Sequence, residues 1–290
     1  ITIDIDSSYE AVITIDGRGN GQSDRPKGPA AYQDHEQVAD VVAVMDAVGV
    51  DKAVLAGVSY GGQLAGLLAA NHPERVLGAV LIGPSIIFGP GHPARNPKHV
   101  IAELERHEGW DKFNVHYWRK HYPDFVDFFF GQTYPESHST KQIEDALGWG
   151  LETTGERVAD SVLGRGISQN NGEDVFRRIR CPVLVIHGDN DHVIPHGKGV
   201  AAANATGGSL VTIAGGGHLP QARDPVLVNR LMKAFGDRGA PPAARRTTWK
   251  RGSSRDKRVL YLSSPIGLGH ARRDLAVAEA LRELRPELKV

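Results

Sequence analysis

One serine stands where its hydroxyl could become a nucleophile. Residues 54–70 read VLAGVSYGGQLAGLLAA, so that Ser59 separates an apolar run from an alanine-rich helical pattern. A strand, then Gly-x-Ser-x-Gly, then a helix is the setting of a nucleophile elbow, a sharp turn that exposes the serine. We expect Gly57 and Gly61 to make room for that turn, because side chains there would collide with neighbouring elements. A plain tight turn with a capping serine fits the same residues, and the motif alone leaves both interpretations open.

A serine hydroxyl needs a base and an orienting acid before it attacks a carbonyl. The chain has 13 histidines, so position must discriminate among them. Asp189 and Asp191 directly follow the apolar run 183–186, and His218 lies in a glycine loop after SLVTIA. The order serine, acid, histidine is the one that an elbow requires, and carboxyl ends of parallel strands meet at one edge of a sheet. The spacing therefore predicts that Ser59, His218 and one of the two aspartates act together.

Other polar residues near the acid have plainer interpretations. His187 ends the strand pattern and is predicted to be buried and hydrogen-bonded. His192 and His196 are predicted either to be solvated or to lie behind the residues that do the chemistry. A zinc site built from His187, Asp189, Asp191 and His192 is disfavoured, because so short a spacing on extended chain cannot aim all four inward. The sequence predicts no metal and no cofactor.

The elements that would hold these residues alternate between strand and helix. Strands are predicted at 11–16, 52–58, 76–84, 181–189 and 209–214, and helices at 34–48, 60–71, 196–205 and 224–235. This alternation predicts a parallel sheet with helices on both faces. It breaks over 85–175, which shows only helical pieces. We therefore predict an α/β core of 1–84 and 176–236 with 85–175 as a helical cap or lid.

Composition narrows the partners. Lys and Arg number 34, as do Asp and Glu, so the formal net charge is zero and nothing favours a nucleic-acid partner. The single Cys181 excludes an intrachain disulfide and fits a reducing compartment. No apolar run is long enough to span a bilayer, and no signal peptide opens the chain. A cytoplasmic protein acting on a small molecule is the expectation.

Four segments in order, DGRGNGQSDRP, GVSYGG, HGDNDHVIP and GGGHLPQARDP, resemble the α/β-hydrolase superfamily from residue 11 to about 236. The resemblance implies the α/β-hydrolase fold with a helical lid. It assigns the acid to Asp191, which is followed after three residues by Pro195, with Asp189 as the alternative. It also implies an oxyanion hole formed by the amide of Tyr60 and a second amide from a His-Gly loop. That loop and the first strands are missing here, so we expect the parent protein to be the enzyme and this fragment to be weakly active or inactive.

The implied activity is hydrolysis of a carboxylic ester, or of a related acyl or C–C substrate, through an acyl-enzyme. Serine at the elbow argues against the dehalogenase and epoxide-hydrolase chemistry that the superfamily runs with a carboxylate. Esterase, lactonase, C–C hydrolase and perhydrolase activities remain open. Aromatic residues of the insertion either line an acyl pocket or form its core: Trp110, Phe113, Tyr117, Trp118, Phe125 and Phe128 to Phe130. A non-catalytic ligand-binding module with the same fold is the alternative, although binding alone does not require the three residues.

The C-terminal part is predicted to be separate. Residues 237–256 have the composition of a linker. Residues 257–290 resemble the first βα unit of GT-B glycosyltransferases, on the strength of Gly267, Gly269 and His270, while Arg272 occupies the place of the third glycine of a dinucleotide fingerprint. The resemblance implies a fused glycosyltransferase-like domain in the parent chain, truncated and inactive here. A glycosyltransferase with a hydrolase scaffold is the remaining alternative.

Overall fold

A parallel sheet forms the centre of the molecule. The computed structural model describes residues 12–165 and 172–237. Within them the sheet has the order β1-β2-β3-β4, with bounds Ala53–Val58, Val76–Ile82, Val183–Gly188 and Ser209–Ile213. All three pairings are parallel, and Ile82 is in register with both Val58 and Ile186. The first three strands therefore end level with one another, and the loops that follow them lie at the same edge.

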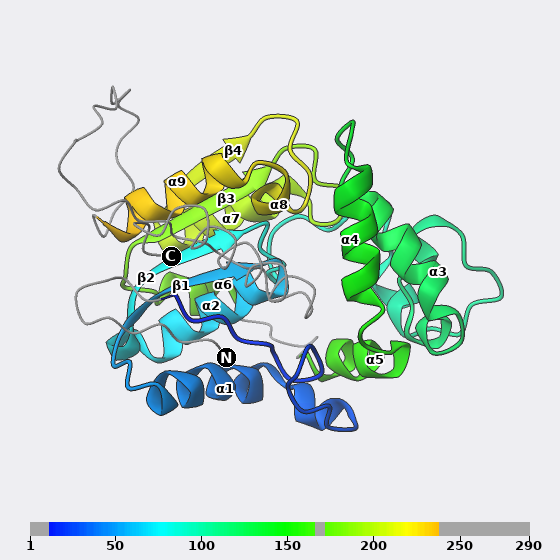
Figure 1. The fold of residues 1–290 in the computed structure, drawn as a ribbon, viewed down its shortest axis with the longest axis horizontal. Helices are drawn as coiled ribbons and strands as arrows, with labels where there is room; N and C mark the ends of the chain where they lie inside the picture. The colour runs from blue at the N-terminus through cyan, green and yellow to red at the C-terminus, as the bar shows by residue number, and fades with distance from the viewer. Residues whose placement is uncertain (1–11, 166–171, 238–290) are drawn as a thin grey trace, which may run out of the picture.

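Helices cover both faces of this sheet (Figure 1). They are η1 Pro29–Tyr32, α1 Asp34–Ala47, α2 Tyr60–Asn71, η2 Pro73–Arg75, α6 Gly172–Arg177, α7 His196–Thr206, α8 Pro220–Arg223 and α9 Pro225–Gly236. Leu81 and Val185 pack with Leu68 of α2 in a cluster that also includes side chains of α1, α6 and α7. Val80 and Ile186 face the other way and pack with Phe235 of α9. Because strand residues alternate between faces, both sides of the sheet are buried, and the predicted parallel sheet with helices on both faces is confirmed.

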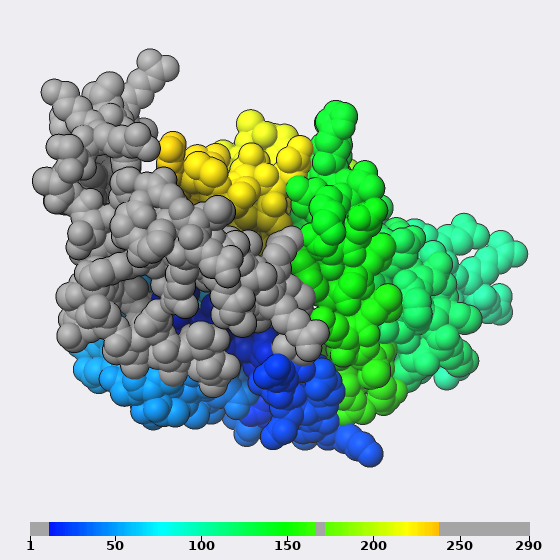
Figure 2. Space-filling model, in the orientation of Figure 1, coloured from blue at the N-terminus to red at the C-terminus, as the bar shows by residue number. Residues whose placement is uncertain are grey.

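The described residues between β2 and β3 form helices joined by irregular chain and include no strand. They contain η3 Pro97–Val100, η4 Gly109–Lys112, α3 Val115–Thr133, α4 Thr140–Gly150 and α5 Gly155–Gly164. Helix α3 is kinked at His121, two residues before Pro123, because proline cannot donate the backbone bond and its ring crowds the preceding turn. These helices form one whole side of the visible surface (Figure 2). We call residues 85–165 the cap.

Aromatic residues of the cap form its own core. Trp118, Phe125 and Phe130 are at most 6% exposed. Phe113 has ring contacts with Trp118 and Phe125, at 4.9 and 5.8 Å between ring centroids. Phe129 extends the same cluster, and Trp110 meets Phe128 edge to face. These contacts favour the packing role, and a role in lining an acyl pocket stays a prediction.

One predicted strand is wrong. Residues 12–16 of AVITID are not part of the sheet and are only partly buried. Their alternating pattern favours an extended chain, but a strand is stable only when a neighbour completes its hydrogen bonds. Among the described residues no strand pairs with this segment, so β1 is the edge of the sheet on this side.

Candidate active site

Ser59 occupies the turn that the glycine-flanked motif predicts. It separates β1 from α2, and its φ of 54° and ψ of −117° are unusual for any residue other than glycine. Its amide donates to Ile82 O at 2.8 Å, and its carbonyl oxygen accepts from the amides of Gly62 and Ser85. Holding a non-glycine residue in such a conformation costs about 1–3 kcal/mol and is common at functional sites.

The two glycines of the motif differ in their surroundings. A Cβ atom at Gly57 would overlap the carbonyl group of Gly61, so only glycine fits before the serine. The same expectation for Gly61 is wrong, because a Cβ there would meet no atom within 4 Å. The first turn of α2 brings the backbone of Gly61, not its side-chain position, against Gly57. The next crowded position is Gly62, where a Cβ would lie 3.1 Å from Pro84 Cβ.

Asp191 and His218 are in direct contact. Asp191 Oδ2 lies 2.8 Å from His218 Nδ1, and Asp191 Oδ1 accepts from the amides of Val193 and Ile194 at 2.8 and 2.9 Å. Since a carboxylate only accepts, this contact places the proton of a neutral His218 on Nδ1 and leaves Nε2 as the basic atom.

The Asp191 carboxyl is ionised despite its burial. Burial alone would raise the pKa of Asp191. The charge of His218, the hydrogen bonds from His187 and His218 and the amide of Ile194 outweigh burial and hold that pKa well below its usual range.

His187 is a second histidine on the same carboxylate oxygen. Its Nε2 lies 3.0 Å from Asp191 Oδ2 and 3.1 Å from Ile194 O, and its side chain is fully buried. Both partners accept, so Nε2 carries the proton. We predicted a buried, hydrogen-bonded histidine but not its contact with the acid. The signal was available, because a histidine that ends the strand four residues before the acid can turn back onto its loop.

The loop after β2 connects the serine to the histidine–aspartate pair. Gly83 begins this loop with a φ of 49°, and a Cβ there would lie 3.3 Å from His218 Nδ1 and 3.5 Å from Asp191 Oδ2. Two residues later, the amide of Ser85 donates to Ser59 O at 2.9 Å. The structure thus joins Asp191 to His218 directly. The loop after β2 contacts this pair at Gly83 and binds Ser59 through the Ser85 amide.

The two atoms that would exchange a proton are not hydrogen-bonded to each other. Over residues 12–165 and 172–237, neither the Ser59 hydroxyl nor His218 Nε2 has a hydrogen-bond partner, and Ser59 is half-buried while His218 is only 2% exposed. Catalytic contacts are often formed only when substrate is bound.

The remaining sequence candidates lie elsewhere. Asp189 is exposed, and its Oδ1 accepts from the amide of Gly215 at 2.6 Å, so it supports the turn before His218 without contacting the imidazole. His192 is exposed and lies 3.1 Å from Asn190 Oδ1. His196 is half-buried, lies 2.9 Å from Thr212 Oγ1 and meets the ring of His187, which matches the predicted position behind the site and not the solvated one. The geometry favours Asp191 over Asp189 as the partner of His218.

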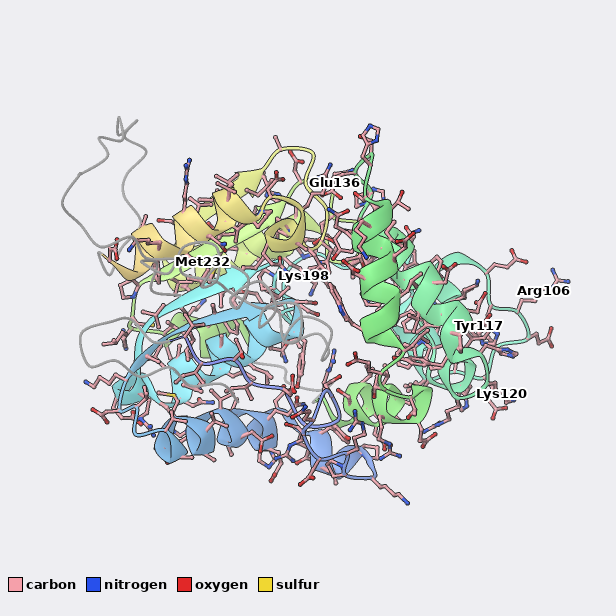
Figure 3. The ribbon with its side chains drawn as sticks, in the orientation of Figure 1. Arg106, Tyr117, Lys120, Glu136, Lys198 and Met232 are labelled. Atoms are coloured by element: carbon pink, nitrogen blue, oxygen red, sulfur yellow. The ribbon has the colours of Figure 1, made fainter. Side chains whose placement is uncertain are left out.

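The cap also holds the histidine loop. Thr133 O accepts from the amide of His218 at 3.0 Å, and Glu136 Oε1 accepts from the amide of Gly217 at 2.6 Å. Glu136 lies where the cap meets the core (Figure 3). Sequence reasoning missed both contacts, because no local pattern tells which part of an insertion folds back onto a loop eighty residues away.

Tyr60 has two separate roles in the geometry. Its amide opens α2, and the first amides of a helix have no partner within the helix and lie at its positive end. Its phenol is turned away from this amide and donates to Asp34 Oδ1 at 2.5 Å. Burial raises the pKa of that phenol far above its usual range. The predicted oxyanion donor is therefore placed at the elbow by a side chain anchored in α1.

Comparisons with known proteins agree with this architecture. The chain is 26% identical over 237 residues to a bifunctional esterase/perhydrolase of Acinetobacter calcoaceticus, covering 77% of this chain and 80% of the relative. It is 40% identical over 240 residues to a 2-hydroxymuconate semialdehyde hydrolase of Pseudomonas putida, covering 79% and 78%. A thermophilic esterase from Thermogutta terrifontis has the same fold, with a TM-score of 0.63, 24% identity and coverage of 77% and 78%.

The family match covers most of the chain. Residues 10–225 match the model of the alpha/beta hydrolase fold. The match gives no support to the glycosyltransferase-like unit or to the fused domain expected after the linker, and 238–290 lie outside the described residues. No helix in the described part of the chain is long and apolar enough to cross a membrane. The chain belongs to the alpha/beta hydrolase fold family.

Proposed function

We propose that this protein is a serine hydrolase that cleaves a carboxylic ester, or a related acyl or C–C substrate, through an acyl-enzyme. The observation that carries the proposal is the contact of 2.8 Å between Asp191 Oδ2 and His218 Nδ1. This contact leaves His218 Nε2 free to act as a base. His218 lies against Gly83, in the same loop whose Ser85 amide donates to Ser59 O. A residue that only caps a turn would need neither a base nor an ionised acid behind it.

The proposed reaction has two balanced halves. Ser59 Oγ attacks the carbonyl carbon and gives its proton to His218 Nε2, while Asp191 stabilises the imidazolium that forms. The bond to the leaving group then breaks, and the imidazolium returns the proton to that group. Water attacks the acyl-enzyme in the same way, so that the carboxylic acid leaves and Ser59 is regenerated. The negative oxygen of each tetrahedral intermediate would be bound by the amide of Tyr60.

The substrate class follows from the elbow residue and the relatives. Serine forms an acyl-enzyme with carbonyl substrates, which favours esters, lactones and related acyl compounds. The names of the two relatives, an esterase/perhydrolase and a semialdehyde hydrolase, point to small organic molecules.

Covalent labelling tests this proposal. A fluorophosphonate probe should label Ser59, as located by peptide mass spectrometry, and Ser59→Ala should abolish the label. With p-nitrophenyl esters from acetyl to decanoyl, Ser59→Ala should lose more than about 1000-fold in kcat/KM. Labelling absent from the wild-type chain, together with equal ester turnover in both proteins, would reject the serine mechanism and favour a ligand-binding role.

A further inference from the structure

The guanidinium of Arg165 makes almost no hydrogen bonds with the described residues. It follows the last residue of α5, and its guanidinium carbon lies 3.7 Å from the centroid of the Tyr60 ring. Its Nε is buried and has no hydrogen-bond partner. Its Nη2 reaches Ser161 Oγ only at 3.5 Å, beyond the usual range of such bonds. The flat face of the guanidinium is therefore occupied by an aromatic ring, while its fork of N–H donors is free.

No carboxylate forms an ion pair with Arg165 among the described residues. Arginines that do have such a partner are Arg18, Arg75, Arg119, Arg157 and Arg177. Asp34 interacts with Arg165 only at longer range, and its two oxygens already accept from Tyr60 Oη and Gln63 Nε2 at 2.5 and 3.0 Å. Burial lowers the pKa of Arg165, and its interactions with Tyr60 and Asp34 only oppose that effect. Arg165 as a whole is half-buried, but its Nε is shielded from solvent. A shielded cation without a counter-charge is costly unless another group supplies the negative charge.

The position of Arg165 links it to the nucleophile. Tyr60 directly follows Ser59, and consecutive Cα atoms are 3.8 Å apart. The guanidinium carbon thus lies within roughly 12 Å of the Ser59 Cα atom. The preceding Gly164 packs on η1, where a Cβ would lie 2.9 Å from Tyr32 Cβ. The end of α5 is consequently packed on η1, and the guanidinium of Arg165 stacks on the residue that directly follows Ser59.

We propose that Arg165 binds a carboxylate of the substrate, so that the preferred substrates are acyl compounds that carry a second, anionic group. The inference rests on the proposed function of Ser59 for the position of the cleaved carbonyl, but the anion site itself does not need catalysis. A guanidinium fork matches the two oxygens of a carboxylate, and charge-assisted bonds of this kind are about twice as strong as neutral ones.

Binding of inert dicarboxylates tests the site without turnover. Isothermal titration calorimetry on the 290-residue chain would measure Kd for malonate, succinate, glutarate and adipate, with glutaramide as an uncharged counterpart. We expect at least one dicarboxylate to bind, and Arg165→Met to weaken it by about 10- to 100-fold while leaving glutaramide unaffected. Arg119→Met is the matched control, because it removes one cap cation whose partner, Glu156, lies 2.8 Å away at the surface. This control should change Kd less than about 2-fold.

Thermal unfolding separates a binding role from a structural one. If Arg165 serves the ligand, Arg165→Met should unfold at the same or a higher temperature than the wild type, since it removes a buried cation without a partner. A lower unfolding temperature together with unchanged dicarboxylate affinity would show that the side chain supports the fold instead. Absence of binding by every dicarboxylate to the wild type would also overturn the inference.

Kinetics then connect the site to the reaction. The mono-p-nitrophenyl ester of glutarate should be preferred over p-nitrophenyl pentanoate, and Arg165→Met should lower that preference by about 10- to 100-fold in kcat/KM. Failure of both esters to react, with dicarboxylate binding that still depends on Arg165, would reject the hydrolase and keep the anion site. Turnover of both esters with no effect of Arg165→Met on the ratio of their kcat/KM values would keep the hydrolase and reject the anion site.

Discussion

Replacing Asp191 by asparagine tests the whole geometry of the site. The carboxylate accepts four hydrogen bonds, two from imidazoles on Oδ2 and two from backbone amides on Oδ1. Asparagine has one accepting oxygen and one donating nitrogen. With the nitrogen toward the imidazoles, it faces two N–H groups. With the nitrogen toward the loop, it faces the amides of Val193 and Ile194. In either orientation the asparagine NH2 group faces two N–H donors and can accept from neither.

The size of the effect follows from these mismatches. A buried donor without an acceptor costs about 1–3 kcal/mol, so we expect Asp191→Asn to lower the free energy of unfolding by about 2–5 kcal/mol. If the amide nitrogen faces His218, the imidazole must move its proton to Nε2 and can no longer act as the base. The comparable tautomer error in serine proteases lowers kcat by about 10⁴-fold, and we expect a loss of about 10³- to 10⁴-fold here.

The assay compares Asp191→Asn with Asp189→Asn. Asp189 is exposed and accepts a hydrogen bond only from the amide of Gly215, which the side-chain oxygen of asparagine can also accept. The kcat/KM of Asp189→Asn for p-nitrophenyl acetate should therefore differ from the wild-type value by less than about 3-fold. Urea unfolding at pH 7 would measure stability, and fluorophosphonate labelling would measure the reactivity of Ser59. Wild-type activity in Asp191→Asn, or equal losses in both variants, would refute the assignment of the acid.

The pH dependence of the free energy of unfolding tests the role of the Asp191 carboxylate independently. The pKa of Asp191 is lowered in the folded state, so its ionisation contributes stability that is complete above the unfolded pKa near 3.9 and is lost as the pH falls. Asparagine does not titrate. The stability difference between wild type and Asp191→Asn should therefore be constant down to about pH 5 and narrow progressively below it.

Three further predictions concern strain, space and charge. Ser59→Gly should abolish turnover yet raise the free energy of unfolding by about 1 kcal/mol, as urea unfolding would show, because glycine relieves the positive φ. Gly57→Ala should destabilise by about 3 kcal/mol or more through its overlap with the carbonyl of Gly61, whereas Gly61→Ala should be tolerated; equal effects on the urea midpoint would contradict this. Burial, reinforced by the charge of Arg95, lowers the pKa of Lys198, in the middle of the molecule (Figure 3), to about 8. The unfolded chain then binds more protons above pH 8, so stability should rise from about pH 8 to pH 10 in the wild type and stay flat in Lys198→Met.

Local patterns were sufficient for most of the core. The buried strands β2 and β3 have near-continuous apolar runs, and α2 follows an elbow whose glycine spacing is specific. Residues 11–16 have an equally good local pattern, yet 12–16 are not in the sheet. A strand depends on a partner that may be far away in sequence, so alternation predicts conformation and not pairing.

The site was predictable where chain order constrains it. Ser59, Asp191 and His218 each follow a strand of the same sheet, and that topology brings their loops to one edge. His187 and Glu136 were not predicted as parts of this site, because their contacts depend on how a buried side chain and a cap loop turn back. No sequence pattern singled out Arg165, because its proposed role depends on the absence of an ion-pair partner among the described residues, which only the structure shows.

Several buried polar atoms of the described residues have no hydrogen-bond partner. They belong to cap residues such as Arg95, Glu136 and Arg165, and to core residues on or beside the loops that the cap covers, among them His187 and Arg223. Proteins leave such atoms unpaired only where water, a ligand or strain accounts for them. The strained Ser59 lies at the same strand edge as these loops. Water or a polar molecule bound where the cap meets these loops would account for the unpaired atoms there.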